Sequence, residues 1–300
     1  MNEIAISPKD FTSDQEVRWC PGCGDYAILK GIRKALAEIG TPPHEVVFVS
    51  GIGCAARFPY YISSYGFHTI HGRAAPIATG VKYANPELDV WVVGGDGDFL
   101  SIGGNHLLHI LRRDVDVNLL LINNAIYGLT KGQYSPTSPI GTRSPSSPEG
   151  SRDNPINGAR FALGAGATFF ARTVDALQDH LPGMAIRAQA HKGSSLVEIL
   201  QNCIIYHDGA FGAAAEKNKS ADFVVRLDHG EKMVYGKERD KGLVFDQNAG
   251  KFVPVMLDGT TSEMDLAIHD EHNLTKAIAL SELDGDDAPT PIGVIYSSPA

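Results

Sequence analysis

Four cysteines are the residues of this chain whose spacing most clearly suggests chemistry. Cys20 and Cys23 form a C-x-x-C motif, while Cys54 and Cys203 stand alone further along the sequence. Four sulfurs can fill one tetrahedral metal site or ligate one [4Fe–4S] cluster. The spacing leaves four interpretations open, namely a thioredoxin-like redox pair, a structural zinc site, an iron–sulfur cluster and ordinary buried cysteines.

A second group of residues offers oxygen ligands. Asp96 lies in a Gly-Asp-Gly-Asp segment directly after the strand-like run VWVVG, and Asn124 lies 28 residues later, after the run NLLLI. A crossover helix fits between the two runs, so the strands can be neighbours and both side chains can face one crevice. With a backbone carbonyl and two phosphate oxygens, they would complete most of an octahedral Mg²⁺ site. The adjacent glycines would let a diphosphate approach the backbone closely.

The elements that must position these residues alternate between strands and helices up to about residue 205. Apolar runs predict strands at 46–50, 90–94, 118–122, 168–172 and 195–200. Spacing and capping signals predict helices at 25–39, 75–84, 102–113, 154–161 and 174–190, the fourth opened by Asn154 and Pro155 and the last broken at Pro182-Gly183. This pattern indicates an α/β fold, a parallel sheet with helices on both faces and ligands at the carboxyl ends of the strands.

Two stretches depart from the alternation. Residues 134–155 are rich in Ser, Pro, Thr and Gly, which predicts a long loop that acts as a lid or is mobile. Beyond residue 205 the chain is more polar, with short strand-like runs between 232 and 255. We therefore expect an α/β domain over 1–205 and a small C-terminal extension over 206–300 that caps the domain or contacts another subunit.

Composition excludes several classes of function. The formal net charge of −9 argues against a nucleic-acid binder and against a protein of anionic membrane surfaces. No apolar run reaches the length of a transmembrane helix, and the N-terminal residues resemble no signal peptide. A cytoplasmic protein is therefore expected.

Five stretches of the sequence together resemble a known family, the β subunits of 2-oxoacid:ferredoxin oxidoreductases. They are CPGCGD at 20–25, GIGC at 51–54, HGRAAPIATG at 71–80, GGDGD at 94–98 and NNAIYGLTKGQYSPTSP at 123–139. The resemblance implies a thiamine-diphosphate-binding fold that holds thiamine diphosphate, Mg²⁺ and one [4Fe–4S] cluster. It also implies an α subunit as partner, in an αβ or (αβ)₂ assembly, with ferredoxin as electron acceptor and coenzyme A as co-substrate.

The resemblance also assigns residues. It makes Cys20, Cys23, Cys54 and Cys203 the cluster ligands, and Asp96, Asn124 and the Ile126 carbonyl the Mg²⁺ ligands. The pocket for the cofactor would be formed by Gly24, Asp25, Gly53, His71, Gly72, Arg73, Gly95, Asp96, Gly97, Asp98, Asn124, Ile126, Gly128, Leu129 and Thr130, with Gln133 as a further candidate. No catalytic residue is assigned in this chain, because the glutamate that activates thiamine is expected from the α subunit.

The substrate suggested by the resemblance is 2-oxoglutarate. The expected reaction interconverts 2-oxoglutarate, coenzyme A and oxidised ferredoxin with succinyl-CoA, CO₂ and reduced ferredoxin. Lys131 and Arg57 would hold the distal carboxylate, and Leu129 would line the same site. The alternatives are a pyruvate-specific or broad-specificity member of the family, or a non-redox thiamine-diphosphate decarboxylase with structural zinc.

Overall fold

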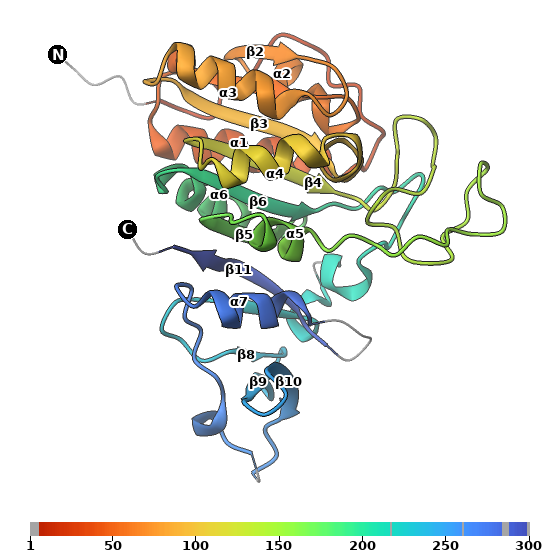
Figure 1. The fold of residues 1–300 in the computed structure, drawn as a ribbon, viewed down its shortest axis with the longest axis vertical. Helices are drawn as coiled ribbons and strands as arrows, with labels where there is room; N and C mark the ends of the chain where they lie inside the picture. Colours follow the sequence, from red (N-terminus) through yellow and green to blue (C-terminus); the bar gives the residue numbers. More distant parts are fainter. Residues whose placement is uncertain (1–5, 217, 260, 284–287, 299–300) are drawn as a thin grey trace.

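An eight-stranded sheet forms the centre of the molecule (Figure 1). The computed structural model describes residues 6–216, 218–259, 261–283 and 288–298. The strand order is β2-β1-β3-β4-β6-β5-β11-β7, and all neighbours are parallel except β11, which runs antiparallel to β5. The strands are β1 (Val46–Ser50), β2 (Tyr65–His68), β3 (Asp89–Gly95), β4 (Val117–Asn123), β5 (Phe169–Val174), β6 (Ser194–Leu200), β7 (Val224–Leu227) and β11 (Thr290–Ser297).

Helices cover both faces of this sheet, as the alternating pattern predicts. The helices are α1 (Asp25–Ile39), α2 (Phe58–Tyr61), α3 (Ala74–Ala84), α4 (Gly104–Arg112), α5 (Gly158–Gly164), α6 (Leu181–Ala190) and α7 (Leu274–Ser281). The central strands β4 and β6 are buried along their whole length, and most of their inner residues are apolar. The expectation of a parallel α/β sheet covered on both sides is confirmed.

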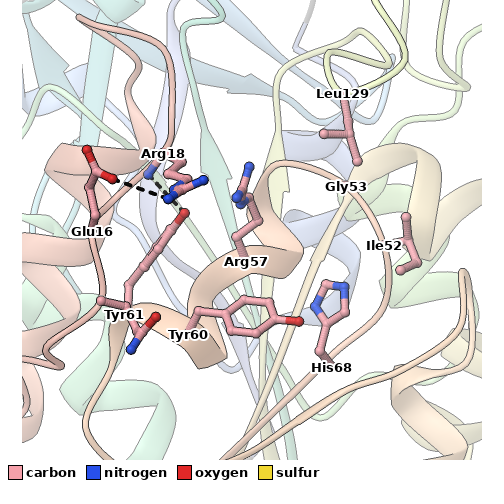
Figure 2. A pocket seen from close by; sticks show the side chains of 10 residues that line it. Glu16, Arg18, Ile52, Gly53, Arg57, Tyr60, Tyr61, His68 and Leu129 are labelled. Atoms are coloured by element: carbon pink, nitrogen blue, oxygen red, sulfur yellow. Dashed lines mark hydrogen bonds and ion pairs between the residues drawn. The ribbon is translucent and has the colours of Figure 1, made fainter.

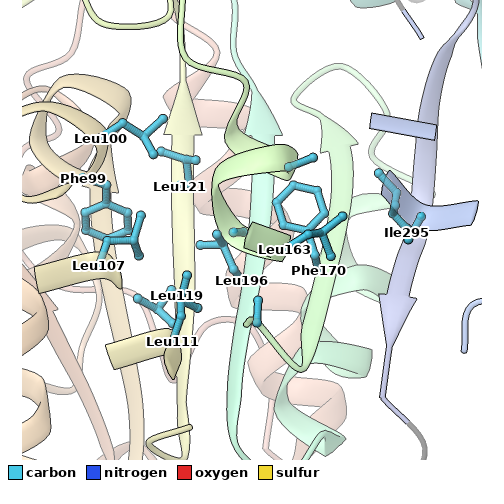
Figure 3. Close-up of a cluster of buried hydrophobic side chains, with 14 of the residues drawn as sticks. Phe99, Leu100, Leu107, Leu111, Leu119, Leu121, Leu163, Phe170, Leu196 and Ile295 are labelled. Carbon is cyan, nitrogen blue, oxygen red and sulfur yellow. The ribbon is translucent and has the colours of Figure 1, made fainter. Parts of the chain in front are cut away.

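Two hydrophobic clusters separate the layers. On one face, Leu119 and Leu121 of β4 and Phe170 of β5 pack under α3, α4, α5 and α7 (Figure 3). On the other face, Trp91 of β3 and Leu120 of β4 pack under α1, α2 and α6. Successive residues of β4 thus point to opposite layers, which fixes the register of the strand.

Two helix boundaries differ from the prediction. The helix expected to open at Asn154 and Pro155 begins at Gly158, because Asn157 is the N-cap and its side chain accepts the Arg160 N–H at 3.0 Å. The stretch 174–190 is not a helix broken at Pro182-Gly183. It is the end of β5, a turn and then α6, where Pro182 lies in the first turn and its missing N–H costs nothing.

The chain beyond residue 205 contributes to two sheets. Three of its strands, β8 (Val234–Tyr235), β9 (Lys241–Asp246) and β10 (Lys251–Met256), form a small antiparallel sheet at the predicted strand-like runs. Two others, β7 and β11, extend the main sheet beyond β5. Within the described ranges, no helix is long and apolar enough to cross a membrane.

The parallel strands end at one edge of the sheet, and the loops that follow them gather there. A single π-helical turn (Gly97–Ile102) follows β3, and the long loop over 134–155 extends beyond the strand ends (Figure 1). All the chemistry-bearing segments of the sequence therefore lie at this edge.

Candidate functional site

The four cysteines line one cavity of about 180 Å³. Cys20 and Cys23 lie in the turn before α1, Cys54 follows β1, and Cys203 follows β6. All four are free thiols. The four cysteines therefore lie together at one edge of the sheet, as the sequence predicts.

Hydrogen bonds hold the cysteine segments together. The Cys23 N–H donates to the Cys20 carbonyl at 3.0 Å, and Gly22 between them has the left-handed φ of +82° that this turn requires. The Trp19 indole Nε1–H donates to the Cys54 carbonyl at 2.8 Å. Gln201 donates from Nε2 to the Cys23 sulfur at 3.4 Å. The C-x-x-C turn is thus fixed against both of the other cysteine segments.

The cavity disfavours free thiolates. Burial, and next the negative charge of Asp25, raise the pKa of Cys54 to about 12, and the same two causes raise the pKa of Cys23. Asp25 is itself buried beside the thiols, and among the described residues neither of its carboxylate oxygens has a hydrogen-bond partner. Burial raises its pKa to about 7. Deprotonated sulfurs would be stable here only beside a cation, so the four-sulfur donor set fits a metal centre.

The spacing of the sulfurs bears on which metal centre fits. Among the described residues, no three ligand atoms that lie within 4.8 Å of one another include a cysteine sulfur. A single tetrahedral zinc with Zn–S bonds of about 2.3 Å would require its sulfurs to be about 3.8 Å apart. The sulfurs are thus farther apart than a single zinc ion requires.

A second cavity, of about 160 Å³, contains the predicted oxygen ligands. Asp96, Asn124 and Ile126 line it together with Gly95 and Gly97. Asn124 and Ile126 reach the same cavity because Ala125 between them has a left-handed φ of +53°, and the Asn124 Oδ1 accepts the Ile126 N–H at 3.2 Å. A carboxylate, an amide oxygen and a backbone carbonyl beside glycines form a donor set that fits Mg²⁺ and a diphosphate.

Three hydroxyls from the long loop hold this metal-type site in place, and we call Ser135, Thr137 and Ser138 the hydroxyl clamp. Ser135 and Thr137 each donate to the Asp96 Oδ2 at 2.5 Å. Ser138 donates to the carbonyl of Ala125 at 2.6 Å. Burial raises the pKa of Asp96, whereas the Ser135 and Thr137 hydroxyls lower it. The clamp leaves the Asp96 Oδ1 for a metal.

The clamp continues into a buried polar network. The Thr137 Oγ1 lies 2.9 Å from the Asn123 Oδ1, and Asn123 donates from Nδ2 to Glu198 at 2.9 Å. Glu198 is almost completely buried and pairs with the Arg172 Nε at 2.7 Å. Asn123 of β4, Glu198 of β6 and Arg172 of β5 are therefore joined by hydrogen bonds, and Thr137 of the loop lies against Asn123.

Asp98 connects two further loops to the same cavity. Its Oδ1 accepts the Gly72 N–H at 2.7 Å and the Ile52 N–H at 3.2 Å, and lies 2.7 Å from the His71 Nδ1. His71 and Gly53 line the cavity, as does Thr130, which donates to Gln133. Arg73, in contrast, is exposed at the start of α3 and is not among the described residues that line the cavity.

Two predicted pocket residues lie at the cysteines instead. Asp25 lines the cysteine cavity and not the one that contains Asp96. Gly24 packs so closely on Asp175 that an added Cβ would lie 1.9 Å from its carboxylate oxygen. The structure thus separates Gly24 and Asp25 from the other predicted cofactor residues.

The two cavities share a wall. Cys54, Asn124, Gly128 and Leu129 line both of them. A Cβ added to Gly128 would lie 3.6 Å from the sulfurs of both Cys54 and Cys203. The backbone at Gly128 therefore lies against the Cys54 and Cys203 thiols and also lines the cavity of Asp96.

A third and larger cavity, of about 470 Å³, opens beside this wall. Arg57 and Leu129 line it, with Arg18 opposite and Tyr60, Tyr61 and His68 below (Figure 2). Arg57 and Lys131 both also line the cysteine cavity. The structure thus brings together Arg57, Leu129 and Lys131, as the sequence predicts for one site.

Lys131 lies in a tight turn that is strained. Its φ is +77°, a conformation that is unfavourable for a residue with a side chain. The Lys131 N–H donates to the Gly128 carbonyl at 3.0 Å, and the Gly132 N–H to the Tyr127 carbonyl at 2.9 Å. Strain of this kind persists where the surroundings impose it, and it is concentrated at functional sites.

Sequence reasoning missed Arg18 and the roles of the hydroxyl clamp. Arg18 is an exposed cation beside Glu16, and nothing in its spacing distinguishes it from a surface residue. Ser135, Thr137 and Ser138 are typical loop residues, and their only signal is that they lie in the motif segment 123–139. No glutamate is among the described residues that line the cavity of Asp96.

Comparisons with known proteins agree with this geometry. Residues 51–199 match the family described as "Thiamine pyrophosphate enzyme, C-terminal TPP binding domain", so the chain has a thiamine-diphosphate-binding fold. The chain is 51% identical over 280 residues to the 2-oxoglutarate oxidoreductase subunit KorB of Mycobacterium tuberculosis, which covers 92% of this chain and 73% of that protein. It is 47% identical over 190 residues to subunit beta of the 2-oxoacid:ferredoxin oxidoreductase 1 of Aeropyrum pernix, a match that covers 63% of this chain and 60% of that protein.

A solved structure extends the likeness to the whole fold. It is the 2-oxoglutarate:ferredoxin oxidoreductase from Magnetococcus marinus with 2-oxoglutarate, coenzyme A and succinyl-CoA bound. The match has a TM-score of 0.79 at 33% identity and covers 98% of this chain and 86% of that one. The resemblance drawn from five sequence motifs is thus confirmed by both comparisons, and the chain belongs to the family of 2-oxoacid:ferredoxin oxidoreductase β subunits.

Proposed function

We propose that this chain is the β subunit of a 2-oxoglutarate:ferredoxin oxidoreductase. The enzyme would interconvert 2-oxoglutarate, coenzyme A and oxidised ferredoxin with succinyl-CoA, CO₂ and reduced ferredoxin. The observation that carries this proposal is the wall shared by the four-thiol cavity and the cavity of Asp96. A decarboxylating centre and a one-electron acceptor must lie this close together if two electrons are to leave the substrate one at a time.

The four thiols would ligate a [4Fe–4S] cluster. The donor set is all sulfur, and the sulfurs are spaced too widely for one zinc ion. The hydrogen bond from Gln201 to the Cys23 sulfur would help to set the reduction potential of the cluster. Cys20 is exposed, and Ile204 and Ile205 beside it are exposed too, so ferredoxin could approach the cluster at this surface.

Asp96, Asn124 and the Ile126 carbonyl would hold Mg²⁺ and through it the diphosphate of thiamine diphosphate. When bound, this cofactor supplies the electron sink that lets a 2-oxoacid lose CO₂. The hydroxyl clamp orients the Asp96 carboxylate by two hydrogen bonds on Oδ2, so that Oδ1 would be the oxygen that binds the metal. Ser138 fixes the Ala125 turn that brings Asn124 and Ile126 into the cavity.

The α subunit would complete the site. A thiamine enzyme requires a glutamate to activate the cofactor, and the described lining of the Asp96 cavity contains none. We infer that the partner α subunit supplies it, so the chain is active only in the αβ complex. The predicted assembly as αβ or (αβ)₂ remains part of this proposal.

Arg57 and Lys131 would select the substrate. A dicarboxylate has a distal carboxylate that requires a cationic partner, and both side chains line one cavity next to Leu129. Lys131 has the strained left-handed φ that is concentrated at functional sites and that an ordinary surface lysine does not need. This pair of cations favours 2-oxoglutarate over pyruvate, which has no distal carboxylate.

Replacing Thr137 with Val tests the clamp. The variant keeps the shape of the side chain but loses the hydroxyl that donates to Asp96, and a hydrogen bond to a charged group contributes about 1.5–3 kcal/mol. We expect the dissociation constants of Mg²⁺ and thiamine diphosphate, measured by calorimetry on the αβ complex, to rise about tenfold or more. Thr142→Val in the same loop, whose hydroxyl bonds the Pro139 carbonyl, is the control. Unchanged affinity in Thr137→Val would refute the positioning role.

Replacing Cys203 with Ser tests the cluster. The anaerobically purified complex should be brown and contain about four irons and four sulfides per β chain. Cys203→Ser should lose iron and visible absorbance, whereas Ile205→Ala, a change in the lining of the same cavity, should keep both. A colourless wild-type protein with one zinc per chain would overturn the redox assignment and favour the non-redox decarboxylase.

Replacing Lys131 with Ala tests the substrate. Ala and Lys are equally unfavourable at a φ of +77°, so the substitution removes the cation without changing the backbone strain. Loss of a charge-assisted contact corresponds to a rise of about 10- to 100-fold in KM for 2-oxoglutarate, with little change for pyruvate. Arg57→Ala should act in the same direction, and Lys34→Ala, an exposed cation of α1, should change neither value. Equal effects on the two substrates would count against the carboxylate role.

A further inference from the structure

A group of metal-type ligands lies outside the three cavities described above. His229 lies in the connection from β7 to β8, and Glu271 and His272 lie directly before α7. One ligand atom of each residue lies within 4.8 Å of the others. Backbone hydrogen bonds fix the two segments side by side, since the Gly230 N–H donates to the His269 carbonyl and the His269 N–H to the Glu231 carbonyl, both at 2.9 Å.

The hydrogen bonds of the His229 and His272 imidazoles show which nitrogen of each ring is a donor and which is an acceptor. The His272 Nδ1 lies 2.7 Å from the Ser297 carbonyl and must donate to it, which leaves the lone pair on Nε2. The His229 Nδ1 accepts the Glu271 N–H at 3.3 Å, so its lone pair faces the segment that carries the other two ligands, and a metal bound at Nδ1 would replace this long hydrogen bond. The ring centroids are 5.0 Å apart. The two neighbouring rings can therefore offer two nitrogen ligands, once the His229 Nδ1 exchanges the N–H for the ion.

Glu271 supplies the third donor from inside the protein. Its side chain is only 8% exposed, and the Oε1 pairs with the Arg187 guanidinium at 2.8 Å. Among the described residues the Oε2 has no such partner, so it is left for a cation. A carboxylate whose second oxygen is held by a neighbour is a common arrangement around metal ions. The nearby Asp270 carboxylate, 4.0 Å from the His229 Nδ1, adds negative charge that favours a cation.

From these contacts we infer a zinc site formed by His229, Glu271 and His272. Two imidazole nitrogens and one carboxylate oxygen suit Zn²⁺, with water as the fourth ligand, whereas Mg²⁺ and Ca²⁺ prefer sites made of oxygen only. The ion would cross-link the β7–β8 connection to the segment before α7. Through the bond from His272 to Ser297 it would also tie both to the end of β11.

The site is structural and independent of the proposed function. Ser297 at the end of β11 pairs with Phe169 at the start of β5, so the site lies at the amino-terminal edge of the parallel strands. The residues that line the cavities of the candidate site follow the carboxyl ends of β1, β4 and β6. These strand ends lie at the opposite edge of the sheet (Figure 1). A zinc ion here would stabilise the C-terminal part of the chain and would take no part in the reaction.

Zinc uptake by the αβ complex with its cluster intact tests the inference. After dialysis against EDTA, the complex receives one equivalent of zinc chloride, is desalted, and its zinc and iron contents are measured. The wild type should retain one zinc per β chain with its iron unchanged, and zinc should raise the unfolding temperature. His229→Gln and His272→Gln should each lose the zinc and the rise, while His44→Gln, an exposed histidine beside Glu45, should keep both.

Three results would overturn the zinc site. They are a wild type that retains no zinc, zinc retention that His229→Gln and His272→Gln do not reduce, and zinc gained only as iron is lost, which would place it at the cysteines. If the variants unfold at a lower temperature than the wild type even without metal, the zinc content is compared at 10 °C below their unfolding temperature, where all the proteins are folded. The wild type should then hold about one zinc per chain and the variants none, whatever their overall stability.

Discussion

A carboxylate buried at the end of a strand is the constraint around which this site is arranged. Asp96 is only 2% exposed, and a buried charge without partners is strongly unfavourable. The hydroxyl clamp offsets part of that cost from one side, and the proposed Mg²⁺ would offset the rest from the cavity side. The clamp in turn depends on the network through Asn123, Glu198 and Arg172, which rigidifies three neighbouring strands.

The same reasoning applies to the cysteines. Burial makes the Cys23 and Cys54 thiols poor acids, and the Asp25 carboxylate in the same cavity has no hydrogen-bond partner among the described residues. Both features become understandable if a cationic centre of iron is bound there, since it would deprotonate the thiols and leave the sulfurs as its ligands. The segment that begins at Asn124 then connects the two sites, because Asn124, Gly128 and Leu129 line both cavities.

Much of this could be predicted from the sequence. The sheet, its covering helices and the gathering of Cys54, Asp96, Asn124 and Cys203 at one edge follow from apolar runs that alternate with helical ones, because parallel strands all end at the same side. The predicted helix start at Asn154 and the predicted helix break at Pro182-Gly183 were wrong. Asn and Pro occur both in turns and in the first turn of a helix, and only the tertiary context selects between them.

The contacts that cross long sequence distances could not be predicted. Thr137 reaches Asp96 over a loop whose path no periodicity encodes, and β11 inserts beside β5 although more than a hundred residues separate them. The pairing of Asp98 with Gly72 and Ile52 likewise depends on the folded loops. The resemblance to a family assigns Gly24 and Asp25 to the cofactor pocket, which stays a prediction, and packing places Gly24 against Asp175 and Asp25 beside the cysteines.

The central claim is that the two cavities work as one electron-transferring unit. Its most direct test is the electron paramagnetic resonance signal of the reduced cluster when the αβ complex receives 2-oxoglutarate without ferredoxin. The wild type should develop the signal. Asp96→Asn, with full iron content, should develop it only with a chemical reductant. A signal of equal size in Asp96→Asn and wild type after addition of 2-oxoglutarate would contradict the account.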